Sequence, residues 1–202
     1  MLIVGGALAA AAFGTGATAS QTTSCHPSGK TLAHDSAAAV YATGGGVYGC
    51  ADSAGIAYKL GSTGTCVQSA RIDHVALAGT VAAFGLERCG VDTGTTMIEV
   101  RRLTDNHAVL PVEPAITGPL GAESYESVGS LVVRRDGAVA WIARGDSIVG
   151  HGPTEVELHR VDSHEHQTLL DSGAGIASGS LRLRGSRLTW RHGQAKRHAT
   201  LR

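Results

Sequence analysis

The sequence has no acidic residue after Asp171, although the whole chain carries 17 acidic residues and 17 Lys and Arg residues. Residues 172–202 nevertheless carry seven cations, so the rest of the chain is acidic by the same amount. This asymmetry indicates either that the basic end packs beside an acidic neighbour or that it forms an anion-binding face. We expect the first, with Arg182, Arg184 and Arg191 in ion pairs between neighbouring units of the fold.

Several motifs of catalysis and metal binding are missing as well. The sequence has no C-x-x-C pair, which argues against a structural zinc site, and no Asp-x-Asp-x-Asp-Gly loop that would indicate calcium. The G-x-S-x-G turn of the common serine hydrolases is also absent. We therefore predict no cofactor.

Proline and lysine are scarce, with 5 prolines and only three lysines against fourteen arginines, whereas glycine is abundant at 28 residues. Many tight turns between short strands are typical of such a composition. Hydrophobic residues make up 43% of the chain and charged residues 17%, which indicates a globular protein rather than a disordered one. The length of 202 residues suits one all-β domain with a substantial core.

The first nineteen residues, "MLIVGGALAAAAFGTGATA", contain no charge and so lack the usual basic start of a secretory signal. They are too short and too rich in Gly and Ala to indicate a membrane span. Ala17-Thr18-Ala19 has the form of a signal-peptidase site. We predict a signal peptide over 1–19 and a single mature domain over 20–202, secreted or extracytoplasmic and without a membrane span; an uncleaved anchor is the alternative.

The chain contains four cysteines, which allow three pairings. The separations of Cys25 from Cys50 and of Cys66 from Cys89 are similar, at 25 and 23 residues. Cys50 and Cys89 each end an apolar segment and precede a turn. We therefore predict the disulfides Cys25–Cys50 and Cys66–Cys89 rather than a pairing that joins Cys50 to Cys66, since an exported chain meets oxidising conditions.

Two segments repeat one another: residues 129–145, "GSLVVRRDGAVAWIARG", and residues 179–193, "GSLRLRGSRLTWRHG". Each opens with Gly-Ser-Leu, passes an Asp-Gly or Gly-Ser hairpin signal, and carries a tryptophan in its second strand. Residues 74–85 and 39–50 read as two further copies. Each copy supplies one aromatic residue that we expect in the core: Tyr48, Phe84, Trp141 and Trp190.

Each unit continues into two more strands, because residues 98–110 resemble residues 156–170. A unit of four antiparallel strands and about 50 residues has the size of a propeller blade. The last unit lacks its fourth strand, and "KTLAHDS" at residues 30–36 resembles "TLLDS" at residues 168–172. We expect a small β-propeller-like ring of about four units, closed by its N- and C-terminal strands; a distorted β-barrel or sandwich is the alternative.

These repeats resemble those of secreted bacterial β-propeller proteins of the TolB or WD40-like type, over residues 30–202. The likeness rests on strand alternation, the aromatic residue of the second strand and the blade length, while the Gly-His and Trp-Asp signatures are missing. The whole chain also resembles a group of small exported proteins of uncharacterised function. The resemblance implies a propeller-like fold outside the cytoplasm and carries over no activity.

The candidate site residues lie mainly in two irregular segments, 113–127 and 145–154, which are longer than plain strand connections. Long loops on rigid scaffolds often carry function, and paired carboxylates can perform acid–base chemistry. The candidate catalytic residues are Glu123, Glu126, Asp146 and His151. Two histidines, His164 and His166, are candidates for the start of a metal site, although no third ligand is evident.

From the lack of any catalytic constellation we predict a non-catalytic, exported module that binds an unknown partner at the cell surface or outside the cell. Nucleic acid is not an expected partner. The alternative is a hydrolase acting on glycans or phosphate esters with the carboxylates of the two irregular segments. Convergence of two or more of the four candidate catalytic residues in one pocket would favour the hydrolase.

Overall fold

A computed structural model describes residues 25, 28–118, 120, 124–147, 154–163 and 166–202, and these residues form sixteen β-strands. The strands divide into a mixed sheet of thirteen and a separate sheet of three, which we call the large sheet and the small sheet. No helix long and apolar enough to cross a membrane occurs among the described residues. The predicted signal peptide, residues 1–19, lies outside the described part. The all-β prediction is confirmed.

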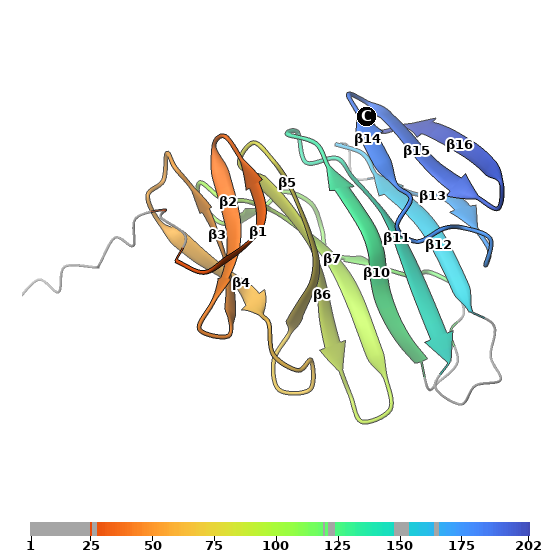
Figure 1. The fold of residues 1–202 in the computed structure, drawn as a ribbon, viewed down its shortest axis with the longest axis horizontal. Coiled ribbons are helices and arrows are strands. Elements are labelled where there is room, and N and C mark those ends of the chain that lie inside the picture. Colours follow the sequence, from red (N-terminus) through yellow and green to blue (C-terminus); the bar gives the residue numbers. More distant parts are fainter. Residues whose placement is uncertain (1–24, 26–27, 119, 121–123, 148–153, 164–165) are drawn as a thin grey trace, which may run out of the picture.

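The large sheet begins with four antiparallel strands at one end of the molecule (Figure 1). The turn between the second and third strands contains Gly44 and Gly45, whose φ angles of 54° and 77° favour glycine. The strands are β1 (Lys30–Asp35), β2 (Ala38–Thr43), β3 (Gly46–Ala51) and β4 (Ala57–Ser62).

A single parallel bridge, Ser62 to Arg71, connects these strands to the next antiparallel group. Another single parallel bridge, Gly94 to Tyr125, connects that group to the last part of the large sheet. The large sheet is thus three antiparallel groups joined at two points. The second group contains β5 (Arg71–Ala78), β6 (Val81–Cys89), β7 (Gly94–Arg102), β8 (His107–Ala108) and β9 (Glu113–Pro114). The third contains β10 (Ser124–Val133), β11 (Val139–Ser147), β12 (Glu155–Val161) and β13 (Gln167–Ser172).

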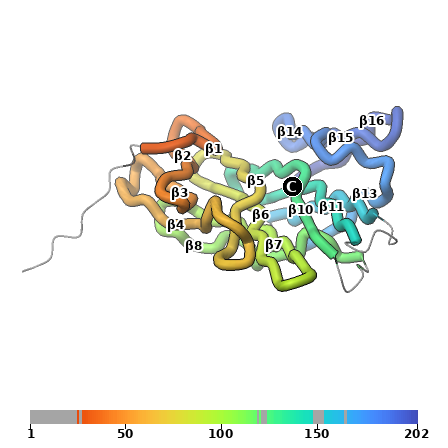
Figure 2. The backbone as a smooth tube through the Cα atoms, turned by 60° about the horizontal axis from the view of Figure 1, so that its bottom comes forward, coloured from red at the N-terminus to blue at the C-terminus, as the bar shows by residue number. Residues whose placement is uncertain are grey.

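The small sheet lies as a layer over β10–β13 (Figure 2). Its predicted two-residue Gly185-Ser186 turn is confirmed, because Arg184 faces Arg187 directly and Gly185 has a φ of 58°. The corresponding Asp136-Gly137 turn is longer than predicted, since Val133 faces Val139 across it. The strands of the small sheet are β14 (Arg182–Arg184), β15 (Arg187–His192) and β16 (Ala195–Thr200).

Three hydrophobic clusters hold the layers together. One joins β1–β4 to the second group, one joins the second group to the third, and one joins the third group to the small sheet. Three of the four expected core aromatics are buried, namely Phe84, Trp141 and Trp190, and the two tryptophans belong to these clusters. The fourth, Tyr48, is half-buried and stacks on Tyr41 with ring centroids 5.9 Å apart.

The expected closure of a ring by the two chain ends is wrong. Residues 30–35 form β1, which pairs with β2, whereas β16 pairs with β15 among the described strands. In Figure 1 the first strand group, which contains β1, lies on the left and the small sheet, which contains β16, lies on the right. The β1–β2 hairpin forms in place of a pairing between β1 and the last strand. Asp35 faces Ala38 across a two-residue turn, and closing so short a loop costs little chain entropy.

The predicted disulfide pairing is confirmed. Cys25 is bonded to Cys50 at the end of β3, and Cys66 is bonded to Cys89 at the end of β6. The first bond ties the start of the described chain to the first strand group. The second bond ties the connection between β4 and β5 to the neighbouring hairpin, so both bonds close loops that the sheet pairing leaves open.

Candidate functional site

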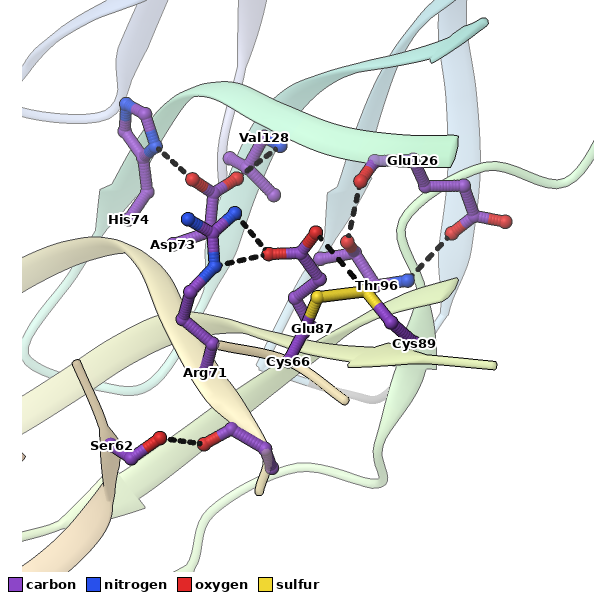
Figure 3. Close-up of polar contacts among 11 residues, drawn as sticks. Ser62, Cys66, Arg71, Asp73, His74, Glu87, Cys89, Thr96, Glu126 and Val128 are labelled. Carbon is purple, nitrogen blue, oxygen red and sulfur yellow. Dashed lines mark hydrogen bonds and ion pairs between the residues drawn. A yellow bond between two sulfur atoms is a disulfide. The ribbon is translucent and has the colours of Figure 1, made fainter. Parts of the chain in front are cut away.

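Carboxylates of the large sheet bind backbone amides of neighbouring strands (Figure 3). Asp73 accepts the N–H of Val128 at 2.8 Å, and Glu126 accepts the N–H of Thr96 at 2.9 Å. Burial alone would raise the pKa of Asp73, but the His74 imidazole, whose Nδ1 lies 3.7 Å from the carboxylate, and the Val128 N–H outweigh it and lower the pKa. These carboxylates are therefore used to join the second and third strand groups.

An ion pair between the half-exposed Arg71 and the buried Glu87 joins β5 to β6. Both Nε and Nη2 of Arg71 contact the Glu87 carboxylate, whose side chain is only 8% exposed (Figure 3). Glu87 also lies beside the sulfurs of Cys66 and Cys89, and these three residues are close enough together to hold a metal ion. The two sulfurs form a disulfide, however, so neither is a thiolate that could ligate a metal.

A second pair, Glu157 and His159, is fully buried where β12 meets residues 117–118. The Glu157 carboxylate accepts the N–H groups of Thr117 at 2.8 Å and Gly118 at 3.0 Å, and it lies 2.7 Å from Nε2 of His159. The imidazole is 1% exposed and stacks on Trp141, with ring centroids 5.3 Å apart. Burial lowers the pKa of His159 more than Glu157 raises it, so a neutral ring donates Nε2–H to the carboxylate.

Two of the four predicted catalytic residues, Glu126 and Asp146, lie in the described part of the chain, while Glu123 and His151 lie outside it. Glu126 faces Gly145 across the β10–β11 ladder, whereas Asp146 faces Tyr125, one position along. Neighbouring positions in a strand point to opposite faces, so Glu126 and Asp146 lie on opposite sides of the sheet. Asp146 is paired with Arg144 at 2.6 Å, which lowers the pKa of Asp146.

Of the predicted metal ligands, only His166 lies among the described residues; His164 does not. His166 is exposed at the start of the β13 hairpin, where its N–H points to Asp162 at 3.4 Å.

The small sheet carries a face made almost wholly of cations. Residues directly opposite in an antiparallel ladder share a face, which places Arg184 with Arg187 and Arg191 with Lys196. A third row between these two pairs contains Arg182, Thr189 and His198. The apolar residues of the same strands face the other way and are buried against β11 and β12. We call this surface the basic face: Arg182, Arg184, Arg187, Thr189, Arg191, Lys196 and His198.

The cations of the basic face are exposed, and most of the face lines a shallow hollow of about 570 Å³. In the part of the chain that the structure describes, its Arg and Lys side chains form no ion pair. Our expectation that Arg182, Arg184 and Arg191 bind acidic neighbours is therefore wrong. The physical reason is the lack of closure: the basic face is the last layer of the stack, and none of the described strand groups covers it.

The one acidic partner that the described residues offer the small sheet lies beneath it. Asp171, at the end of β13, accepts hydrogen bonds from Trp190 Nε1 at 2.7 Å and Arg197 Nη1 at 2.6 Å, and its Oδ2 lies 3.1 Å from His192 Nδ1. Burial alone would raise the pKa of Asp171, but these donors lower it. The Asp171 contact therefore holds the small sheet on the large one without neutralising the basic face.

Sequence patterns did not identify the Glu157–His159 pair or the role of Asp171. Glu157 matches Glu99 in the repeat, which indicates only a shared strand position. The signal for Asp171 was present in the sequence, since it is the last acidic residue of the chain and lies shortly before the repeated unit, residues 179–193, that it supports.

The chain matches no family model, no curated protein and no solved structure.

Proposed function

We propose that this protein is an exported, non-catalytic module that binds an anionic polymer outside the cytoplasm through the basic face. The observation that carries this proposal is a set of exposed cations on one surface without acidic neighbours among the described residues. Folded proteins gain little from leaving like charges together, so such a surface supports binding of an external anion.

The engaged carboxylates support a binding role over the hydrolase alternative. Glu126, Glu157 and Asp73 each accept backbone amide hydrogens. A general acid or base needs a carboxylate that faces a substrate, and these face the backbone of neighbouring strands or of residues 117–118. The two disulfides and the resemblance to secreted repeat proteins support a location outside the cytoplasm.

The test is a binding titration with heparin, a sulfated polymer, and with neutral dextran. The triple variant R182Q/R184Q/R187Q removes three charges from the basic face. A matched variant, R88Q/R102Q/R135Q, removes three exposed charges from the large sheet and its turns and has the same net charge. We expect the first variant to lose at least about tenfold in heparin affinity and the second to bind like the wild type.

Equal losses in both variants would show that binding follows net charge alone and would overturn the proposal. Binding of dextran by the wild type would also contradict it. Size analysis of the polymer after incubation checks the non-catalytic part: its length should not change, and shortening would favour a hydrolase.

A further inference from the structure

The arrangement of the cations narrows the class of polymer. We propose that the basic face holds a linear phosphodiester polymer without bases, extended along β14–β16, with each facing pair of cations binding one phosphate. This inference rests on the proposed function and adds the chemistry of the ligand to it.

Two like-charged pairs stand directly opposite one another on the basic face: Arg184 with Arg187, and Arg191 with Lys196. Side chains in such positions have Cβ atoms about 5 Å apart, and like charges there destabilise the sheet. All four residues are exposed. An anion placed between the members of a pair converts this repulsion into two charge-assisted contacts.

A phosphodiester can bridge a facing pair, because each of its two anionic oxygens can accept hydrogen bonds from a different cation. A carboxylate also offers two oxygens to a guanidinium. The titration described below therefore compares the two anions directly.

The spacing of the pairs requires a polymer. Arg187 and Arg191 are four residues apart on β15, which corresponds to about 14 Å along the strand. The row of Arg182, Thr189 and His198 lies halfway, about 7 Å from each pair. A single phosphate can occupy one pair at a time, whereas an extended chain with about three phosphates reaches all three rows.

The basic face has few of the rings by which proteins hold unpaired bases. Single-stranded nucleic acids are bound through bases stacked on aromatic side chains. The face contains no Phe, Tyr or Trp, because Trp190 is 4% exposed and packs inward against the large sheet, and its one ring is the imidazole of His198. The geometry therefore favours a polyol phosphate chain over a nucleic acid.

The experiment is calorimetric titration of the full chain with synthetic glycerol phosphate oligomers of one to six phosphates. Oligogalacturonate and oligothymidylate of equal charge are the comparison ligands. Affinity should rise steeply up to about three phosphates and then level off, and both comparison ligands should bind at least about tenfold more weakly.

Double-mutant cycles test the pairs themselves. R184Q and R187Q remove members of one pair, so each should weaken binding by about five- to tenfold and their combination by little more than either alone. R184Q and R191Q belong to different pairs, and their losses should multiply. The salt dependence of the affinity should also become weaker, with a slope smaller by about 0.7 for each phosphate that a variant no longer binds.

The outcomes separate this inference from the proposed function. If oligogalacturonate binds as well as the phosphate oligomer, or if R184Q and R187Q act independently, the phosphate pairs are wrong while polymer binding stands. Tighter binding of oligothymidylate would make nucleic acid the ligand. If neither these ligands nor heparin bind, the proposed function fails as well.

Discussion

The arginines of the large sheet and of the small sheet differ in their ion pairing. In the large sheet Arg71, Arg101 and Arg134 each pair with a carboxylate of the same sheet or its turns. In the small sheet only Arg197 has a described carboxylate partner, and that partner, Asp171, belongs to the large sheet. Packing therefore does not neutralise the charge asymmetry of the sequence, because the last layer turns its cations outward instead.

Position in the stack explains the difference. The middle strand groups contact neighbours on both faces, so a charge there is either paired or costly. At the first end, β1–β4 hold stacked tyrosines, and a disulfide ties the start of the described chain to β3. The small sheet ends the stack and has one face that no described strand group covers, where charge costs little because water solvates it.

The largest expected loss of stability comes from a substitution in the core of the large sheet. Trp141→Ala in the large sheet removes a fully buried indole, its stacking on His159 and its hydrogen bond to the Ala115 carbonyl. We expect a loss of about 3–5 kcal/mol in the free energy of unfolding, measured by urea titration. Trp141→Phe, which keeps most of the ring packing, is the control and should lose less. A loss below about 1 kcal/mol for the alanine variant would contradict this packing.

The comparison between the sheets is tested by two matched arginine variants. Arg71→Gln leaves the mostly buried Glu87 carboxylate without its cation, and we expect a loss of about 1–3 kcal/mol. Arg184→Gln relieves a like-charge pair on an exposed face, so stability should stay within about 0.5 kcal/mol or rise. Equal destabilisation by both variants, measured in the same urea titrations, would show that Arg184 has a structural partner.

Stability should depend on pH through different groups in the two regions. The pKa of His159 is lowered by burial, so the unfolded chain binds more protons below about pH 6.5, and stability falls as the pH decreases through that value. The slope is at most about 1.4 kcal/mol per pH unit for this one group. His159→Gln should flatten the profile between about pH 7 and pH 5. An unchanged slope in this variant would assign the titration to another group.

The small sheet should lose its support only at lower pH. The pKa of Asp171 is lowered by its donors, so its contribution is complete above about pH 4 and is lost as the pH falls further. The fluorescence of Trp190, compared in the wild type and Asp171→Asn, monitors this contact. A wild-type change already complete at about pH 6 would contradict the assignment.

Local patterns predicted the strands and the disulfides, because strand alternation, hairpin signals and cysteine spacing are encoded within short stretches. The predicted ring closure was wrong at residues 30–36. Their likeness to residues 168–172 suggested a distant partner, but they pair with the adjacent strand β2. The basic face was visible as a run of cations, but its exposure depended on which layer came last. The Glu157–His159 pair depends on contact with residues 117–118, which no local pattern contains.

The assignment of the basic face to a ligand is tested by the melting temperature of the wild type and of R182Q/R184Q/R187Q, each with and without glycerol phosphate hexamer. Without the hexamer the variant should melt at the same temperature as the wild type or higher, since the three charges have no acidic partner among the described residues. Hexamer at about 100 times the wild-type Kd should stabilise the wild type by about 2.7 kcal/mol, and a variant that binds at least tenfold more weakly by no more than about 1.4 kcal/mol. A variant that melts lower than the wild type without hexamer, or gains as much from it, would contradict the claim that these arginines serve a ligand rather than the fold.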